Sequence, residues 1–316
     1  MTPNYLIWPV DCREAMRQFI APQSVNTVVT SPPYFGLRDY GCDGQIGLEP
    51  TPDEFVSALV EVFREVRRVL RDDGTVWLNL GDSYSGSGKG VWNASEERKS
   101  AVKETYRPSV NPVKTETGLA QKQLIGIPWR VAFALQADGW YLRQDIIWHK
   151  PNPMPESVTD RCTKAHEYVF LLSKSPKYYF DSVAIKEPAV NTRKPGRKIR
   201  DTRETHGTGG GNAGINNLMA RYHDGEMPTH RNRRSVWTVT TKPFKGAHFA
   251  TFPPDLIEPC VLAGCPEGGL VYDPFGGSGT TAIVALRNGR NAVLSELNRE
   301  YVEMAHARIA ALTAPA

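Results

Sequence analysis

The sequence predicts an α/β protein built on a doubly wound, mostly parallel β-sheet. Short apolar runs rich in β-branched residues alternate with stretches of helical spacing along most of the 316 residues. Two polar stretches, residues 84–122 and 186–235, interrupt the alternation. A chain of this length with 40% hydrophobic residues can bury one large core. We therefore expect one α/β domain that carries two insertions.

The first predicted strand covers residues 25–30, a buried run of β-branched residues. Pro32 and Pro33 follow and can continue neither a β-ladder nor a helix, so the strand must end in a stiff loop. Residues 51–70 carry apolar side chains at helical spacing with acidic residues near the start, which is typical of an amphipathic helix. An Asp-Asp-Gly turn then leads into a second strand over residues 75–82.

The remaining elements continue the same alternation. Residues 127–140 predict a helix closed by Gly139, and residues 141–150 predict a strand. After the second insertion the expected order is helix, strand, helix, strand, helix. The corresponding ranges are 256–264, 268–275, 278–288, 291–298 and 299–312.

The second insertion carries the basic excess of the chain. Residues 186–234 contain eleven Lys and Arg against five Asp and Glu, whereas the whole chain has a net charge of +4. Such a local excess is the electrostatic footprint of a nucleic-acid contact, although a solvated basic loop would look similar in isolation. The glycine-rich run THGTGGGNAGINN within it is typical of a flexible or separately folded insert. Residues 84–122 are interpreted as a mobile insertion.

Several protein classes are disfavoured by composition. No apolar run approaches the roughly 20 residues that span a bilayer, and the N-terminus lacks the pattern of a signal peptide. Five cysteines are scattered without a CxxC pair or a histidine cluster, so no metal site is expected. We expect a soluble, cytoplasmic protein.

The stretch GGSGTTA follows one predicted strand and opens a helix. Gly277, Gly279 and Ala282 match the spacing GxGxxA, and Glu296 closes the next predicted strand. Small residues let the backbone approach a ligand, the helix N-terminus offers free N–H groups, and the carboxylate accepts from ribose hydroxyls. This arrangement predicts an adenosine-containing ligand.

Two other nucleotide ligands fit this loop less well. A triphosphate site would require GxxxxGK[ST], and no lysine follows the glycines. The glycines alone leave a nicotinamide cofactor open. Asp273 precedes them, however, and a carboxylate there would repel a pyrophosphate and suit a cationic ligand.

The segment TSPPY, residues 30–34, stands at the carboxyl end of the first predicted strand, where ligands bind in open α/β sheets. The Ser31 side chain and the Pro32 carbonyl can accept hydrogen bonds from the amino group of a flat base, while Tyr34 stacks on its face. These acceptors shift the amino nitrogen toward sp³ character, so that its lone pair can attack an electrophilic methyl group. A proline-stiffened turn with a packed tyrosine is the structural alternative.

TSPPY together with DPFGGSGTT, residues 273–281, resembles the DNA amino-methyltransferases that modify N4 of cytosine or N6 of adenine. The order of the motifs, with the catalytic motif first and a basic segment between, resembles the β group of that family. The resemblance implies a Rossmann-like fold with permuted motif order, S-adenosyl-L-methionine as cofactor and double-stranded DNA as substrate. It divides the chain into a catalytic part (1–185), a target-recognition insert (186–235) and a cofactor-binding part (236–316).

The resemblance also implies roles for individual residues. Ser31, Pro32, Pro33 and Tyr34 would be catalytic. The cofactor would be bound by Asp11, Phe249, Thr251, Pro253, Asp273, Phe275, Gly277, Gly279 and Glu296. Phosphate contacts are expected from Arg193, Lys194, Arg197, Lys198, Arg200, Arg231, Arg233 and Arg234.

A flipped-out base and in-line methyl transfer follow from the resemblance. Serine before the prolines favours cytosine N4 over adenine N6, and both stay open. Asp39 and Asp82 are conceivable proton acceptors, with turn roles favoured for both. A protein glutamine methyltransferase and a catalytically silent DNA-binding module are the other interpretations. The sequence is silent on a cognate restriction endonuclease and on whether the protein is a monomer or a homodimer.

Overall fold

An eight-stranded sheet forms the centre of the protein in the computed structural model, which describes residues 4–86, 116–189, 229–241 and 252–313. The chain divides into two units. The larger unit comprises Met1–Asp181 and Arg234–Ala316, and the smaller unit comprises Ser182–Arg233. The smaller unit overlaps the predicted insert 186–235, whose role in target recognition stays a prediction.

The strand order in the sheet is β1-β10-β9-β2-β3-β5-β4-β8. Strand β5 is antiparallel to both of its neighbours, and every other neighbouring pair is parallel. The predicted doubly wound, mostly parallel sheet is therefore confirmed. The strands are β1 Tyr5–Trp8, β2 Val25–Thr30, β3 Leu70–Leu80, β4 Tyr141–His149, β5 His166–Ser173, β8 Val236–Thr238, β9 Leu270–Asp273 and β10 Asn291–Ser295.

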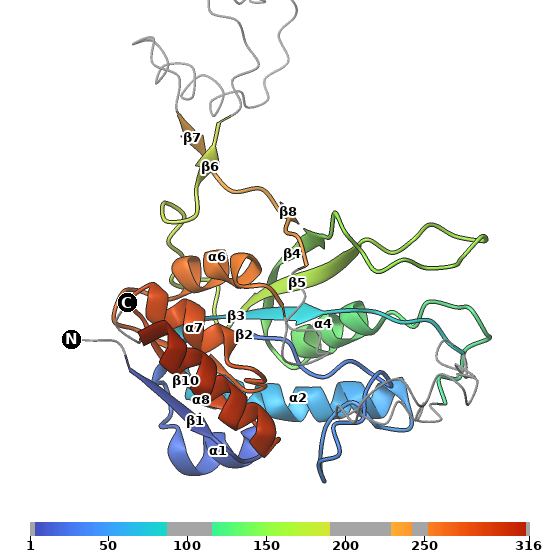
Figure 1. Ribbon diagram of the computed structural model, residues 1–316, viewed down its shortest axis with the longest axis horizontal. Helices are drawn as coiled ribbons and strands as arrows, with labels where there is room; N and C mark the ends of the chain where they lie inside the picture. Colours follow the sequence, from blue (N-terminus) through green and yellow to red (C-terminus); the bar gives the residue numbers. More distant parts are fainter. Residues whose placement is uncertain (1–3, 87–115, 190–228, 242–251, 314–316) are drawn as a thin grey trace, which may run out of the picture. The chain divides into compact units, whose positions relative to one another are not determined.

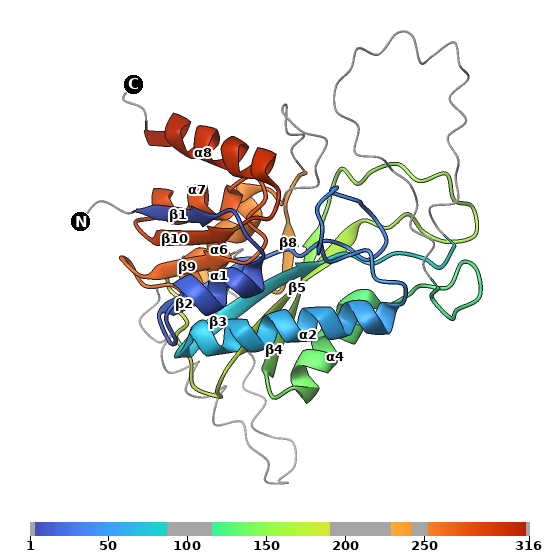
Figure 2. The ribbon, with the colours of Figure 1, turned by 90° about the horizontal axis from the view of Figure 1, so that it is seen from below.

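Helices cover both faces of this sheet. One layer contains α1, α2 and α4, and the other contains α6, α7 and α8 (Figures 1 and 2). Among the described residues, no helix combines the length and apolarity needed to cross a membrane. The helices are α1 Cys12–Phe19, α2 Pro52–Val69, α4 Ile127–Ala137, α6 Pro254–Gly264, α7 Thr280–Arg287 and α8 Arg299–Thr313.

Helix α2 illustrates how the sequence pattern becomes packing. The Thr51 side chain caps its N-terminus by accepting a 3.2 Å hydrogen bond from the Glu54 backbone N–H. Its apolar stripe, including Phe55, Leu59 and Phe63, is fully buried in the main core cluster. This burial fixes the α2 layer against the sheet.

The central strands determine where a site can form. From β9 the chain passes through α7 to β10 on one side, whereas from β2 it passes through α2 to β3 on the other side. Because β2 and β9 are neighbours that lead in opposite directions, a crevice opens at their carboxyl ends. These are the ends that carry the serine-proline-proline-tyrosine segment and the glycine loop.

The structure also corrects the predicted element list. Strands β1, β5 and β8 and helix α1 were not predicted. Strand β3 begins at Leu70, five residues before the expected start at 75, because Leu70 already pairs with Val25 of β2. The predicted strand 291–298 ends at Ser295, so Glu296 follows β10 instead of closing it.

The smaller unit contains a two-stranded antiparallel ladder of β6 Glu187–Pro188 and β7 His230–Arg231. The Arg231 guanidinium donates to Glu187 Oε1 at 2.8 Å across this ladder. The predicted phosphate contact Arg231 is therefore already paired with a carboxylate.

Candidate active site

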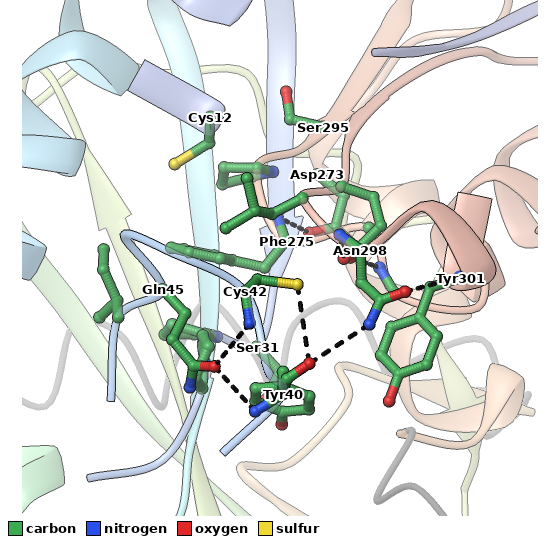
Figure 3. Close-up of a pocket in the computed structure, with 18 of the residues that line it drawn as sticks. Cys12, Ser31, Tyr40, Cys42, Gln45, Asp273, Phe275, Ser295, Asn298 and Tyr301 are labelled. Atoms are coloured by element: carbon green, nitrogen blue, oxygen red, sulfur yellow. Dashed lines mark hydrogen bonds between the residues drawn. The ribbon is translucent and has the colours of Figure 1, made fainter. Parts of the chain in front are cut away.

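A pocket lies at the carboxyl ends of β2, β9 and β10 (Figure 3). Segments that are far apart in the sequence form its walls. They are residues 10–12, residues 31–34, most of the loop 37–46, the glycine loop 273–278, residues 295–298 and two α8 side chains, Tyr301 and Met304. Phe252, before α6, also lines it. The pocket therefore unites both sequence motifs.

All four residues from Ser31 to Tyr34 line the pocket. The last residue of β2, Thr30, is buried at 1% exposure, so the strand delivers the segment directly from the core. Thr30 Oγ1 donates a 2.6 Å hydrogen bond to Asp273 Oδ1 at the end of β9. A hydrogen bond between the ends of β2 and β9 thus links the SPPY segment to the glycine loop.

Tyr34 is held at its hydroxyl and at its ring. Its hydroxyl donates a 2.7 Å hydrogen bond to Glu167 Oε2. A Cβ atom at Gly81 would lie 2.5 Å from Tyr34 Cε2, so only glycine at position 81 leaves room for the ring. Burial and the nearby Glu167 carboxylate raise the pKa of Tyr34 well above its ordinary value, so the phenol is neutral.

Asp273 is a buried carboxyl group whose two oxygens both accept hydrogen bonds. The donors are Thr30 Oγ1, Thr281 Oγ1 at 2.6 Å and the Phe275 backbone N–H at 3.1 Å. Burial raises its pKa to about 6, and the three hydrogen bonds limit that rise. Asp273 thus ties β2, the glycine loop and α7 together.

The glycines of the loop have different tasks. Gly277 has φ +48°, a Cβ there would meet only the Phe275 carbonyl oxygen at 3.9 Å, and its backbone N–H donates a 2.7 Å hydrogen bond to Glu296 Oε2. Gly279, with φ +78°, does not line the pocket; a Cβ there would lie 2.9 Å from Ala305 Cβ on α8. Gly277 therefore shapes the pocket, whereas Gly279 lets α8 approach the loop.

Glu296 stands at the pocket with both oxygens oriented by backbone groups. Oε2 accepts from Gly277 and Oε1 accepts from the Asn298 backbone N–H at 2.8 Å. Burial raises the pKa of Glu296, which these hydrogen bonds partly offset. Each carboxylate oxygen has a further lone pair with which it can accept from a ligand hydroxyl.

Asp11 caps helix α1 and lines the same pocket. Its carboxylate accepts from the Arg13 backbone N–H at 2.8 Å and from Arg13 Nε at 2.9 Å. Burial raises the pKa of Asp11, but the Arg13 hydrogen bonds and charge outweigh it, so that the pKa lies below its ordinary value. Asp11 is an oriented acceptor beside the pocket.

The remaining predicted cofactor residues are placed only in part. Phe249 and Thr251 lie outside the described residues. Pro253 is the N-cap of α6, and its neighbour Phe252 reaches the pocket instead. Phe275 lines the pocket as expected.

Three of the predicted phosphate contacts belong to the described residues, and five do not. Arg231 and Arg233 belong to the smaller unit, and Arg234 opens the second segment of the larger unit. The others, Arg193, Lys194, Arg197, Lys198 and Arg200, lie outside the described residues.

Sequence reasoning missed the wall formed by the loop 37–46. Gln45 Oε1 accepts from the Tyr40 backbone N–H at 2.8 Å, and Asn298 Nδ2 donates to the Tyr40 carbonyl at 3.5 Å (Figure 3). The Tyr40 ring meets Tyr301 of α8 edge to face at 6.2 Å. Polar residues of a loop show no periodicity, so no local signal marks them.

The two conceivable proton acceptors have turn roles. Asp39 Oδ1 accepts from the Gly41 backbone N–H at 2.8 Å. Asp82 Oδ1 accepts from the backbone N–H groups of Ser83, Gly126 and Ile127 at 2.9 to 3.0 Å, and so stabilises the start of α4. Neither lines the pocket.

Comparison with known proteins identifies the family. A family model described as DNA methylase matches residues 25–307. This chain belongs to the N6/N4 DNA methylase family. The family resemblance and the predicted class of activity, S-adenosyl-L-methionine-dependent methylation of DNA, are thereby confirmed.

Relatives cover almost the whole of this N6/N4 DNA methylase. Type II methyltransferase M.SmaI of Serratia marcescens is 46% identical over 299 residues, which are 95% of this chain and 88% of the relative. Type II methyltransferase M.Cfr9I of Citrobacter freundii is 48% identical over 286 residues, which are 90% of this chain and 81% of the relative.

Solved structures share the fold of this N6/N4 DNA methylase. The PvuII DNA methyltransferase (cytosine-N4-specific) superimposes with a TM-score of 0.60 at 18% identity, covering 98% of this chain and 93% of that one. A protein of Thermus thermophilus described as a DNA modification methylase, complexed with S-adenosyl-L-methionine, gives a TM-score of 0.57 at 24% identity, covering 98% and 94%.

Proposed function

We propose that this protein methylates N4 of a cytosine in double-stranded DNA, with S-adenosyl-L-methionine bound in the pocket described above. The observation that carries the proposal is that one pocket joins Ser31, Pro32 and Tyr34 to the glycine loop and Glu296. Methyl transfer needs the acceptor nitrogen and the methyl donor in one enclosed space. A pocket lined by both motifs supplies that space.

The lining of the pocket fits this cofactor. Asp11, Asp273 and Glu296 contribute carboxyl groups, whereas Arg38 is the one basic residue of the described lining. An acidic lining attracts a sulfonium cation and disfavours a pyrophosphate. Glu296 would accept from the ribose hydroxyls, and the Phe275 and Tyr301 rings of the lining would offer apolar surface to the adenine. When bound, the cofactor supplies an electrophilic methyl group.

The residues of the SPPY segment would hold and activate the base. The Ser31 hydroxyl and the Pro32 carbonyl accept hydrogen bonds from the two amino hydrogens, which localises the nitrogen lone pair. The Tyr34 hydroxyl already donates to Glu167, so it is not the hydroxyl but the face of the ring that would contact the base, by stacking on it. A base inside a duplex cannot reach the pocket, so it must flip out. Positioning of this kind can supply roughly 7–11 kcal/mol of the barrier.

Asp273 would act at longer range. Its oxygens already accept hydrogen bonds from Thr30, Thr281 and Phe275. Asp273 would therefore act on the cofactor through the electric field of its negative charge and not through a direct contact. In a site of low dielectric such a field favours a cationic ligand.

Cytosine is favoured over adenine by Ser31. A serine in front of the two prolines resembles the cytosine-N4 enzymes, and a relative in fold, the PvuII enzyme, is named cytosine-N4-specific. Both amino groups have the same donors, so adenine N6 is the alternative outcome of the test.

Contact with the DNA backbone is assigned to the basic segment. Residues 186–234 carry eleven cationic against five anionic side chains, and cations that neutralise phosphates release counterions on binding. Eight of these cations are the proposed phosphate contacts named above. Recognition of a particular base sequence would rest on other side chains of the same segment.

A restriction partner and an oligomeric state complete the proposal. The relatives M.SmaI and M.Cfr9I are named type II methyltransferases, which supports a cognate restriction endonuclease for this protein as well. The protein would act as a monomer or a homodimer.

The intact Ser31, Tyr34 and glycine loop speak against a catalytically silent DNA-binding module, and the family match speaks against a protein glutamine substrate.

The test is incubation with tritiated S-adenosyl-L-methionine and unmethylated DNA, followed by nucleoside digestion and mass spectrometry. N4-methylcytosine made by the wild type and not by Ser31→Ala supports the proposal. N6-methyladenine would keep the mechanism and change the base. No methylated nucleoside across DNAs of varied sequence would overturn it.

A further inference from the structure

A cluster of polar residues surrounds the Tyr34 hydroxyl and has no part in the proposed reaction so far. Glu167 Oε2 accepts from the Tyr34 hydroxyl at 2.7 Å and from Asn79 Nδ2 at 3.3 Å. Its other oxygen, Oε1, forms an ion pair with Lys150 Nζ. The Glu167 and Lys150 side chains are only 15% and 18% exposed. A largely buried ion pair costs free energy unless its geometry is good, so its place beside the pocket needs a reason.

The sheet brings these residues together from three strands. Asn79 lies at the end of β3, where it also donates to the Tyr168 carbonyl at 3.0 Å. Glu167 on β5 stands opposite Trp148 of β4. Lys150 follows β4 directly, and its ammonium lies 4.2 Å from the centre of the Trp148 ring. Regular strands therefore fix the position of the Glu167 carboxylate.

We infer that Glu167 is a positioning residue for methyl transfer, which orients the Tyr34 ring by accepting its hydroxyl hydrogen bond. The inference rests on the proposed function, in which Tyr34 stacks on the flipped base. Gly81 leaves room for one side of the ring, and the Glu167 hydrogen bond fixes its far end. Together they leave the ring a single orientation.

This assignment separates two roles for the tyrosine. The phenol hydrogen is used up in the bond to Glu167, so the hydroxyl serves as an anchor and the ring face serves the base. Removal of the acceptor would leave the ring in place but less ordered. Such a change lowers the rate of methyl transfer and leaves binding of the cofactor unaffected.

The experiment compares two double variants that differ only in the acceptor. Glu167→Gln with Lys150→Met removes both charges and keeps an amide oxygen for Tyr34. Glu167→Leu with Lys150→Met removes the charges and the 2.7 Å acceptor, and leaves the Tyr34 hydroxyl only the longer 3.4 Å contact with Asn79 Oδ1. We expect the first to transfer methyl groups about 3- to 10-fold faster than the second in single turnover, the value of one neutral hydrogen bond. In a Tyr34→Phe background the two should be equal.

Two further readouts keep the outcome clear. The Kd for S-adenosyl-L-methionine should match the wild type in both double variants, which excludes misfolding. Tyrosine ring resonances in ¹³C NMR, assigned through Tyr34→Phe, should stay sharp with glutamine at 167 and broaden with leucine. Glu65→Ala is the control, since it removes a carboxylate paired with Arg68 at 2.9 Å on α2 and should change neither readout.

A rate difference that persists in the Tyr34→Phe background, or none in the Tyr34 background, overturns the inference. If the wild type methylates no DNA, the proposed function fails by itself, and the NMR comparison still decides whether Glu167 orders Tyr34. Equal Tyr34 line widths in the two double variants would then overturn the inference.

Discussion

The Thr30 hydroxyl and the Asp273 carboxylate form a buried 2.6 Å hydrogen bond between the last residues of two neighbouring strands. The first residue precedes the SPPY segment and the second precedes the glycine loop. The two residues are 1% exposed, so the bond is shielded from water. Together with the parallel pairing of β2 and β9, this contact sets the spacing between the proposed catalytic and cofactor segments.

Replacing Thr30 by valine should weaken both stability and cofactor binding. The variant keeps the shape of the side chain but leaves a buried carboxylate with one donor fewer, which costs about 1–3 kcal/mol. Urea unfolding at pH 7.5 measures the deficit. The loss of unfolding free energy should be smaller at pH 4.5, where Asp273 is protonated. An equal loss at both pH values would contradict the role of Thr30 as a donor to the Asp273 carboxylate.

Asp273 should give the protein a characteristic pH dependence. Its folded pKa of about 6 lies above the ordinary 3.8, so the native state binds more protons in that window. Stability from this group is present below pH 3.8 and is lost as the pH rises through 6. Relative to Asp273→Asn, the wild type should lose roughly 2 kcal/mol of unfolding free energy between pH 4.5 and 7.5. Parallel pH profiles of the two proteins would refute this.

Gly279→Ala should be more destabilising than Gly268→Ala. Both glycines have a positive φ, +78° and +75°, so alanine costs about 1–2 kcal/mol of backbone strain at either. Only at Gly279 does the new Cβ meet a neighbour, Ala305 Cβ at 2.9 Å, which adds about 1–3 kcal/mol. Chemical denaturation of the two variants measures the difference in unfolding free energy. Equal losses of unfolding free energy would show that α8 moves away from the new Cβ at no cost.

Ser31→Ala should affect catalysis far more than cofactor binding. Removing one preorganised hydrogen-bonding group from the reacting centre costs about 100-fold in rate. Single-turnover methylation and titration with S-adenosyl-L-methionine separate the two effects. A variant that binds cofactor weakly but reacts at the normal rate would place Ser31 in the cofactor site instead.

The basic segment should control the salt dependence of DNA binding. Changing Arg197, Lys198 and Arg200 to glutamine should reduce the slope of log K against log salt by about 0.9 for each phosphate that is no longer neutralised. The matched control neutralises Arg17, Arg64 and Arg71, three cations of the larger unit. The same slope change in both variants would mean that net charge, and not the segment, is responsible.

Local patterns made a large part of this fold predictable. Strand β2 was predicted with its observed bounds, and α2 within one residue at either end, because buried β-branched runs and helical stripes are visible in sequence. Strand β5 was missed, because an antiparallel return between β3 and β4 depends on pairing with both and leaves no parallel βαβ signature.

The candidate site divides in the same way. Ser31, Asp273 and Gly277 could be named because their motifs are contiguous. Tyr40 and Glu167 could not, because the loop that holds Tyr40 and the strand that presents Glu167 reach the site only through tertiary packing. Polar residues at strand ends have no period, and their partners lie more than a hundred residues away in the chain.

The central place of β2, between β9 and β3, has a consequence for biosynthesis. Strand β2 ends at Thr30, but β9 begins only at Leu270, and β10 and α8 follow it in the sequence. Until residues 270–296 have been translated, β2 therefore has one uncovered edge, and neither Asp273 nor Glu296 exists to complete the pocket. A nascent chain that stops before residue 270 therefore has the SPPY segment but lacks the opposite wall of the pocket.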